Sequence, residues 1–392
     1  MTQLALIPSD VGSSKPTAAE FFAGIGLVRM GLEDAGFKVV WSNDIEPAKQ
    51  EMYERHFDDP EGGHTFEPGD VADVKGSQMV DGLTLAWASF PCTDLSLAGA
   101  RRGLAGSESG TFWHFERVLR EMGDRQPPVV ALENVVGLAT SHGGEDLAAA
   151  IRALNELDYS VDVLTIDARR FVPQSRPRLF LVGALEPPED EPVPNSELRP
   201  DWLQAPFGDP SLTTHRALLP APPPPRTTGL TELAEKVPPG SDLWWDDQRR
   251  TAFLDSLSRI QAERLEALRK DRRISRRTAY RRTRGGKPMW EIRPDDIAGC
   301  LRTARGGSSK QAVVEAGHGQ VRVRWMTPRE YARLMGAGDY CLDGLRTNQA
   351  LFGFGDAVCV PVVSWLAREY LMPLVRGELR AAEPPQLAVV GA

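Results

Sequence analysis

Short apolar runs alternate with amphipathic stretches over the first half of the chain. The apolar runs span four to eight residues, and runs of that length bounded by turn-forming residues are typical of buried strands. They predict strands at residues 17–22, 38–42, 83–90, 129–132, 160–166 and 179–183.

The stretches between these runs have the spacing of helices. PAKQEMYERHF, FWHFERVLREM and EDLAAAIRALNEL place apolar residues three and four positions apart, which gives a helix one buried face. Strands that alternate with helices in this way predict an α/β fold, with a mostly parallel sheet covered by helices on both faces.

Proline-rich stretches interrupt the pattern after residue 185. EPPEDEPVPNSELRP and LPAPPPPR predict an irregular linker, and a mixed, basic segment follows it. Helical patterning returns near Arg324, where Thr327, Pro328 and Glu330 form a capping box. We expect a flexible arm at 1–16, a first domain at 17–185, a linker and smaller domain at 186–323, a return to the first domain at 324–375, and a disordered tail at 376–392.

Composition narrows the class of protein. The 392 residues contain no run of about 18 apolar residues, the length that spans a bilayer, and the N-terminus lacks the features of a signal peptide. The four cysteines form no C-x-x-C pair. We therefore expect a cytoplasmic protein without a membrane partner, a disulfide framework or a structural metal.

The charge is unevenly distributed. The net charge is −8, but residues 249–287 hold 14 Lys and Arg against 4 Asp and Glu. Such a run is often only a solvated face. Here Tyr280 lies within the run and Trp290 just beyond it. A surface that binds the phosphates of a nucleic acid is therefore at least as good an interpretation. Trp244, Trp245 and Trp290 either insert as wedges into a nucleic acid or, as aromatic residues more commonly do, belong to the hydrophobic core.

Glycines and acids follow the first strands. Gly24 and Gly26 follow the first predicted strand, although their spacing misses the G-x-G-x-x-G pattern of dinucleotide sites. Asp44 comes 20 residues after Gly24, where an acid binds ribose hydroxyls or, alternatively, caps the next helix. Asp70 follows a Pro-Gly turn and is a further candidate for the same pocket.

A cysteine and a glutamate follow two more strands. Cys92 comes directly after Pro91, and Glu133 follows the strand at 129–132. The carboxyl ends of parallel strands share one edge of a sheet, so both side chains are expected beside the glycine turn. Free cysteines are most often buried hydrophobes. At this edge, next to an acid, a nucleophile is the better interpretation of Cys92.

Two further segments carry arginines. Residues 93–111 are rich in small residues and glycine, and they predict a lid over the substrate, with Arg101 and Arg102 placed to meet phosphate. Arg176 and Arg178 point to the same side of an extended segment and would anchor a carboxylate or phosphate.

The motifs in this order resemble those of the DNA (cytosine-5) methyltransferase family. The resemblance rests on FFAGIGLVRMGLEDAGF, SNDIEPAKQEMYERHF, PGDV, FPCTDLSLAG, ENVVG, PQSRPR, TPREYARLMG and QALFGFGDAVCVPV. It covers residues 18–183 and 324–371, and the segment between them corresponds in place to the target-recognition domain of that family. It implies the S-adenosylmethionine-dependent, Rossmann-like methyltransferase fold.

The resemblance also implies roles for individual residues. Cys92 would add to C6 of a cytosine flipped out of the duplex, a protonated Glu133 would contact the base, and Arg178, supported by Arg176, would hold it. S-adenosylmethionine would be the cofactor, S-adenosylhomocysteine the product, and no metal would take part. The implied cofactor contacts are Phe22, Ala23, Gly24, Ile25, Gly26, Asp44, Ile45, Asp70, Val71, Pro91, Asp356, Ala357 and Val358. The DNA contacts, which combine this resemblance with the charge pattern, are Arg101, Arg102, Arg272, Arg273, Arg276, Arg277, Arg281, Arg282 and Arg284.

The implied setting is bacterial. Double-stranded DNA would be the partner of a monomeric enzyme that acts at the nucleoid in restriction–modification or phage defence, with other proteins of that system as further partners.

Three positions depart from the pattern of the family. Asp356 stands where an asparagine is usual and places an anion near the carboxylate of the cofactor. Ile45 replaces an aromatic residue that stacks on adenine. Thr93 to Ser96 replace the common Gln-x-Phe-Ser. None of these changes removes a reacting group, so we expect an active enzyme with ordinary or weakened cofactor binding.

Three other functions compete with this interpretation. A transfer-RNA methyltransferase of the same family would have a shorter middle segment. A cofactor-gated DNA-binding protein without catalysis would not need Cys92 and Glu133. A nicotinamide dehydrogenase is disfavoured by the glycine spacing.

Overall fold

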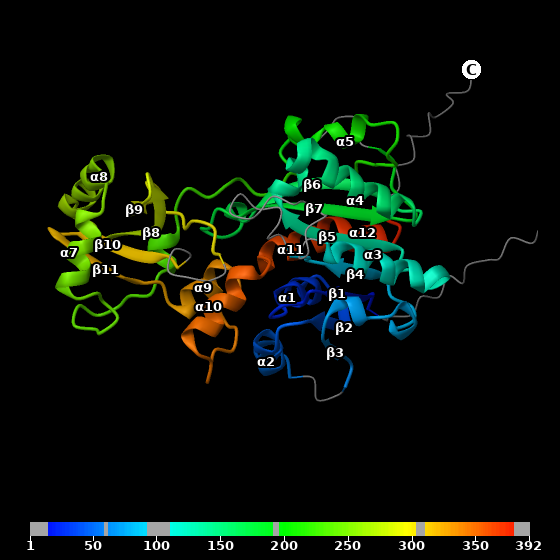
Figure 1. Ribbon diagram of the computed structural model, residues 1–392, viewed down its shortest axis with the longest axis horizontal. Coiled ribbons are helices and arrows are strands. Elements are labelled where there is room, and N and C mark those ends of the chain that lie inside the picture. Colours follow the sequence, from blue (N-terminus) through cyan, green and yellow to red (C-terminus); the bar gives the residue numbers. More distant parts are fainter. Residues whose placement is uncertain (1–14, 59–61, 92–109, 191–195, 303–309, 380–392) are drawn as a thin grey trace, which may run out of the picture.

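A seven-stranded sheet forms the centre of the larger part of the molecule (Figure 1). The computed structural model describes residues 15–58, 62–91, 110–190, 196–302 and 310–379. The strand order is β3-β2-β1-β4-β5-β7-β6. The strands are β1 (Thr17–Phe21), β2 (Lys38–Asp44), β3 (Thr65–Pro68), β4 (Leu85–Ala88), β5 (Val129–Val135), β6 (Ser160–Asp167) and β7 (Pro177–Ala184).

Six of these strands coincide with the six apolar runs predicted from the sequence, and their ends differ from the predicted ends by a few residues at most. β3 was not predicted, since TFEP has no buried apolar run. Strands β3, β2, β1, β4 and β5 pair in parallel, whereas β7 pairs antiparallel with both β5 and β6. The expectation of a mostly parallel α/β sheet is confirmed. The strand order reverses between β1 and β4, the place where open α/β sheets bind ligands.

Helices cover both faces of this sheet. Alternate residues of each strand enter different core clusters: Leu85 and Trp87 lie on one face, and Ala86 and Ala88 on the other. α3 and α4 cover the second face, and α1, α9, α10 and α11 cover the first. The bounds are α1 (Leu27–Asp34), α2 (Pro47–His56), α3 (Thr111–Met122), α4 (Glu145–Asn155), α9 (Pro328–Leu334), α10 (Thr347–Asp356), α11 (Val360–Leu366) and α12 (Met372–Val375).

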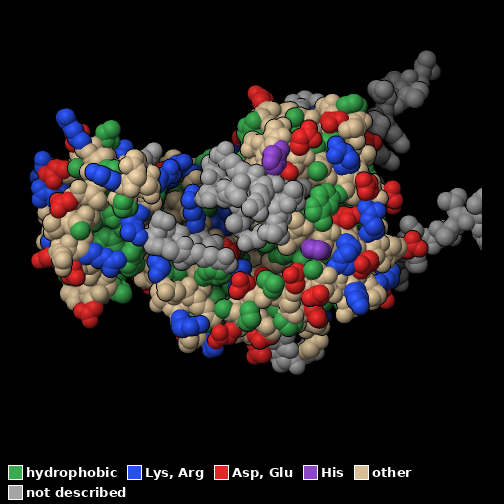
Figure 2. Space-filling view, viewed as in Figure 1, with side chains coloured by type: hydrophobic (Ala, Val, Ile, Leu, Met, Phe, Trp, Pro, Cys, Tyr) green, Lys and Arg blue, Asp and Glu red, His purple; other side chains and the backbone are tan. Residues whose placement is uncertain are grey.

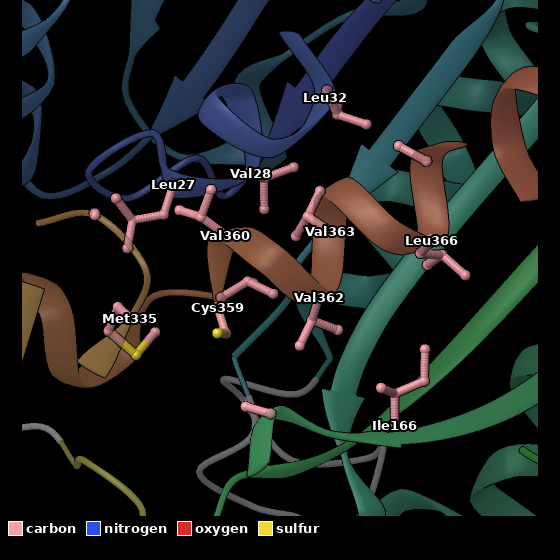
Figure 3. Packing of buried hydrophobic residues seen from close by; sticks show 14 of the residues in the cluster. Leu27, Val28, Leu32, Ile166, Met335, Cys359, Val360, Val362, Val363 and Leu366 are labelled. Atoms are coloured by element: carbon pink, nitrogen blue, oxygen red, sulfur yellow. The ribbon is translucent and has the colours of Figure 1, made fainter. Parts of the chain in front are cut away.

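The C-terminal helices pack against the N-terminal part of the chain. α11 packs against α1, with Val360 and Val363 facing Val28 (Figure 3). The two helices approach closely at Gly31, where an added Cβ would lie 2.6 Å from the Cβ of Val363. Glycine at this position therefore allows α11 to pack directly on α1.

The segment Thr347–Val375 has the length and composition of a membrane span, which the sequence analysis did not anticipate. Its most apolar 18-residue window has a mean hydropathy of 1.7. However, 72% of that window is buried inside the protein, against α1 and the sheet. Core packing accounts for its apolar character.

The proline-rich connection after β7 is irregular, as predicted, but it is bound to the edge of the sheet. Val161 and Thr165 of β6 donate backbone hydrogen bonds to Thr213 and Leu198. The connection thus covers the free side of β6, which would otherwise expose unpaired backbone groups. Two short helices lie beyond it, α5 (Ala205–Gly208) and α6 (Leu230–Leu233).

A fully buried ion pair fastens this connection. The side chains of Asp162 and Arg199 are 0% exposed, and Arg199 Nε lies 2.9 Å from Asp162 Oδ1. The Tyr370 hydroxyl donates to Asp162 Oδ2 at 3.0 Å, which links the C-terminal helices to the same carboxylate.

Removing the cation of this pair is expected to destabilise the fold. Arg199→Met leaves Asp162 charged and buried, so the free energy of unfolding should fall by about 3–5 kcal/mol. Denaturant titration measures this change. Arg259→Met removes a pair with Glu263 whose side chains are 92% and 62% exposed, and it should cost less than about 1 kcal/mol. Equal losses in the two variants would contradict the interpretation.

A separate antiparallel sheet, in the order β11-β10-β8-β9, forms the smaller lobe (Figure 1). Trp245, Phe253 and Trp290 lie in its core, so Trp245 and Trp290 are core residues. Trp244 is half-buried, with its indole N–H bound to the carbonyl of Pro238. The elements are α7 (Asp247–Asp255), α8 (Arg259–Lys270), β8 (Ser275–Arg284), β9 (Lys287–Ile292), β10 (Ala312–Gly317) and β11 (Gln320–Trp325).

Candidate functional site

The glycine turn follows β1 at the point where the strand order reverses. Phe22, Gly24 and Gly26 all have positive φ angles, of 58°, 59° and 79°. A Cβ on Gly26 would lie 2.3 Å from the Phe57 ring, so only glycine fits there. At Gly24 an added Cβ would meet nothing nearer than Lys49 Cδ at 4.0 Å. The turn therefore has room on the Gly24 side.

Asp44 ends β2 beside this turn, as predicted. Its Oδ2 accepts a hydrogen bond from the backbone N–H of Gly24 at 2.8 Å. Its Oδ1 accepts one from the backbone N–H of Glu46, the N-cap residue of α2, at 2.9 Å. Asp44 thus links the glycine turn to the start of α2. This contact resembles the capping role that was the alternative interpretation of Asp44, although the N-cap residue itself is Glu46.

The residues expected near adenine lie at the ends of β2 and β3. Ile45 is 60% exposed, directly after Asp44. Asp70 is exposed and accepts a hydrogen bond from the backbone N–H of Ala72, while Val71 is buried. Their contacts with a cofactor stay predictions.

Glu133 lies within β5, further along the same edge of the sheet. Its side chain is 8% exposed, and its Oε1 lies 2.7 Å from Arg178 Nε. Burial raises the pKa of Glu133, and the nearby charges of Arg178 and Arg176 oppose that shift. A carboxyl with a raised pKa is suited to donating a proton or a hydrogen bond near neutral pH.

Asn134 connects this acid to the end of β4. Its side-chain amide donates to the carbonyl of Phe90 at 3.1 Å, and Phe90 precedes the half-buried Pro91. The chain is therefore held beside Glu133 at Phe90, two residues before Cys92. Cys92 itself, residues 93–109 of the predicted lid, and with them Arg101 and Arg102, lie outside the described residues. Asn134 was not among the predicted site residues, although it belongs to the ENVVG motif.

Arg176 joins three distant segments. Its side chain is buried and donates to the carbonyls of Leu301 at 2.8 Å, Ala357 at 2.6 Å and Gly355 at 3.3 Å. The expected anchoring of a carboxylate applies to Arg178, whose anion is Glu133. Arg176 instead anchors backbone carbonyls.

Cys300 is a second thiol near these arginines. Its Sγ lies 3.4 Å from Arg176 Nη1. Burial alone would raise the pKa of Cys300, but the charges of Arg176 and Arg178 lower it. Cys359 differs, because burial in the apolar core raises its pKa to about 12. The sequence gave no sign of the position of Cys300, because the arginines lie more than 120 residues away.

The C-terminal segment that the resemblance assigns to the cofactor, residues 356–358, begins at the last residue of α10. Asp356 ends α10, and its Oδ2 lies 3.3 Å from Lys49 Nζ of α2. Lys49 was not among the predicted site residues. Ala357 bonds Arg176 through its carbonyl, and Val358 is buried.

The predicted basic residues differ in accessibility. Arg276 is buried in a pair with Glu315, and the Arg277 side chain is 14% exposed and pairs with Asp296, so both are engaged within the protein; their contacts with DNA stay predictions. Arg272, Arg273 and Arg282 are exposed. The guanidinium carbon of Arg281 lies 5.8 Å from the centre of the Trp290 ring, and the side chain of Arg284 is not described. Figure 2 shows Lys and Arg side chains on this lobe interspersed with acidic ones.

The residues at this edge fit S-adenosylmethionine by their chemistry. The turn leaves space at Gly24, and Asp44 offers a carboxylate to ribose hydroxyls. Pro91 follows β4 and Glu133 lies within β5 near its carboxyl end, where the reacting groups would gather. Among the described residues, no three His, Cys, Asp or Glu side chains are grouped so that they could hold a metal ion.

The strand order and this edge together define an S-adenosylmethionine-dependent methyltransferase fold. The chain belongs to the C-5 cytosine-specific DNA methylase family, whose sequence model matches residues 17–371.

Individual relatives agree with this assignment. The Type II methyltransferase M.HhaI of Haemophilus parahaemolyticus is 33% identical over 165 residues, 42% of this chain and 47% of that protein. M.HaeII of Haemophilus aegyptius is 34% identical, over 43% of this chain and 50% of that protein. The chain thus matches about half the length of these two relatives. M.HpaII of Haemophilus parainfluenzae is 25% identical over 92% of this chain and 90% of its own length.

Solved structures share the fold. The S. pombe Dnmt2 methyltransferase superposes with a TM-score of 0.58 at 16% identity, covering 92% of this chain and 99% of its own. An Entamoeba histolytica methyltransferase, EhMeth, gives 0.56 at 13% identity, covering 94% and 100%.

Proposed function

We propose that the protein is a DNA (cytosine-5) methyltransferase that uses S-adenosylmethionine. The observation that carries the proposal is the grouping of the glycine turn, Asp44, the Pro91 end of β4 and the Glu133–Arg178 pair at the reversal point of the sheet. The description of the family, C-5 cytosine-specific DNA methylase, supports DNA as the substrate.

Each residue has a defined task in this chemistry. The cytosine must leave the duplex to be reached, at a cost of a few kcal/mol. The Cys92 thiolate forms a bond to C6, which makes C5 nucleophilic, and charge then builds at N3, where protonated Glu133 donates. S-adenosylmethionine, when bound, supplies the methyl group to C5. A water molecule then takes the C5 proton, which allows the C6–S bond to break and frees the Cys92 thiolate, while N3 returns its proton to Glu133.

The arginines would hold the reacting groups in place. Arg178 fixes the Glu133 carboxyl, and Arg176 holds the backbone carbonyls of Leu301 and Ala357. The smaller lobe would recognise the target sequence. Arg272, Arg273, Arg281, Arg282 and Arg284, together with Arg101 and Arg102, would follow its phosphates.

The proposed setting is a bacterial restriction–modification or phage-defence system. The enzyme would act in the cytoplasm, as a monomer on nucleoid DNA. Proteins of the same system are its proposed further partners.

Methyl transfer tests the proposal. Purified protein is incubated with methyl-labelled S-adenosylmethionine and either duplex DNA or total transfer RNA. Label should enter DNA as 5-methyldeoxycytidine, and bisulfite sequencing would give its context. Label in transfer RNA alone would favour the RNA alternative. DNA binding without any methyl transfer, unchanged in a Cys92→Ser variant, would favour a non-catalytic protein.

A further inference from the structure

Lys49 and Asp356 form an ion pair beside the glycine turn. Lys49 belongs to α2 and Asp356 to the last turn of α10, and the two charged atoms lie 3.3 Å apart. The side chains are 15% and 33% exposed, so the pair is partly shielded from water yet accessible. A cation and an anion are thus presented together at the place where the sequence predicts cofactor contacts.

Neighbouring contacts fix both partners. The Gln349 side chain of α10 donates to the carbonyl of Ala48 at 3.2 Å and to Glu51 at 2.8 Å, which ties α10 to α2. Lys49 Nζ also lies 5.7 Å from the centre of the Phe352 ring, one helical turn before Asp356. Gln349 therefore joins the two helices independently of the ion pair.

The pair lies next to the open side of the turn. Lys49 Cδ is the atom nearest to an added Cβ at Gly24, at 4.0 Å. The next residue, Ala357, accepts a hydrogen bond from Arg176 through its carbonyl. Arg176 is also one of the charges near Glu133. Lys49 and Asp356 therefore lie between the glycine turn and the residues proposed to act on the base.

The chemistry of the cofactor matches this pair. The amino-acid end of S-adenosylmethionine carries one carboxylate and one ammonium group, and charge-assisted hydrogen bonds are about twice as strong as neutral ones. An unpaired Asp356 would repel that carboxylate, and for this reason the sequence predicts ordinary or weakened cofactor binding. Lys49 offsets this negative charge and adds a cation for the carboxylate.

We propose that Lys49 and Asp356 together bind the amino-acid end of S-adenosylmethionine, Lys49 through its carboxylate and Asp356 through its ammonium group. This inference rests on the proposed function, which places the cofactor at the glycine turn. It assigns to Lys49 a binding role that follows from its position opposite Asp356.

Calorimetry with two ligands tests the inference. S-adenosylhomocysteine carries the amino-acid group, whereas 5′-methylthioadenosine has the nucleoside and sulfur without it. Lys49→Met should weaken S-adenosylhomocysteine binding about 10- to 100-fold, since a hydrogen bond to a charged group is lost. It should leave 5′-methylthioadenosine binding within about twofold, because that ligand has no group for Lys49 to bind.

The double variant gives the sharper result. Because Lys49 and Asp356 bind different groups of the ligand, Asp356→Asn alone should also weaken S-adenosylhomocysteine binding, and the double variant should bind it more weakly than either single variant. A pair that only joined α2 to α10 would instead give equal losses in the single and double variants, for both ligands. That result would overturn the inference while leaving the proposed function intact.

Controls separate the remaining outcomes. Lys270→Ala, which removes an exposed lysine of α8, should bind both ligands as the unmodified protein does. The unfolding temperatures of all ligand-free variants should agree within a few degrees. If the unmodified protein binds neither ligand, the proposed cofactor is wrong, and the inference is overturned with it.

Discussion

A Cys92→Ser variant should lose methyl transfer by about 10⁴-fold or more while still binding DNA. A cysteine thiol is a few per cent ionised at neutral pH and is intrinsically very nucleophilic. A serine hydroxyl ionises far less and is a much weaker nucleophile toward C6 of the base. Single-turnover methyl transfer measures the effect, and a DNA mobility assay checks that binding is retained.

A matched cysteine serves as the control for this variant. Cys341→Ser replaces a half-buried thiol outside the proposed site and should keep the rate within about twofold. A duplex with 5-fluorocytosine at the target adds a direct readout, since C5 then has no proton to lose and the chain stays bonded to the DNA. Near-normal methyl transfer by the Cys92→Ser variant would contradict the assignment of Cys92 as the nucleophile.

A Glu133→Gln variant should lose about 10²- to 10⁴-fold in the rate of methyl transfer, the range of general acid–base catalysis. The pH profile gives a second signature. Because burial raises the pKa of Glu133, its protonated form persists to higher pH than in an exposed glutamate. The contribution of Glu133 should then fall as the pH rises through that raised pKa, and glutamine, which does not titrate there, should lack this decrease.

Glu156→Gln is the control for charge alone. Glu156 is 61% exposed and pairs with Arg120 at the surface, so its replacement should change neither the rate nor the pH profile. If Glu133→Gln retained the full rate, or kept the same decrease with pH, another group would have to supply the proton near N3.

The larger sheet was predictable because its strands carry their own signal. The six predicted runs are apolar enough to be buried on both faces, and a parallel sheet requires that pattern. β3 lacks it: TFEP is a short edge strand held by its pairing with β2. The edge where Asp44 and Glu133 lie was predictable for a related reason, since the carboxyl ends of parallel strands must lie together.

The smaller sheet was not predictable from local pattern. The arginine-rich sequence of β8 has the composition of a solvated surface, yet its pairing with β9 and β10 places Arg276 beside Glu315 of β10 and Arg277 beside Asp296. Which arginines become buried depends on these acids from elsewhere in the chain. Lys49 was missed for the same reason, because its partner Asp356 comes 307 residues later.

The packing of α11 on α1 has a consequence for synthesis on the ribosome. α1 is synthesised long before α11, and its Val28 and Gly31 pack against residues near 360. A nascent chain must therefore hold an apolar stripe open while more than 300 residues are added. We expect release of partly made chains to yield aggregates, and the first domain to become protease-resistant only after α11 has left the exit tunnel.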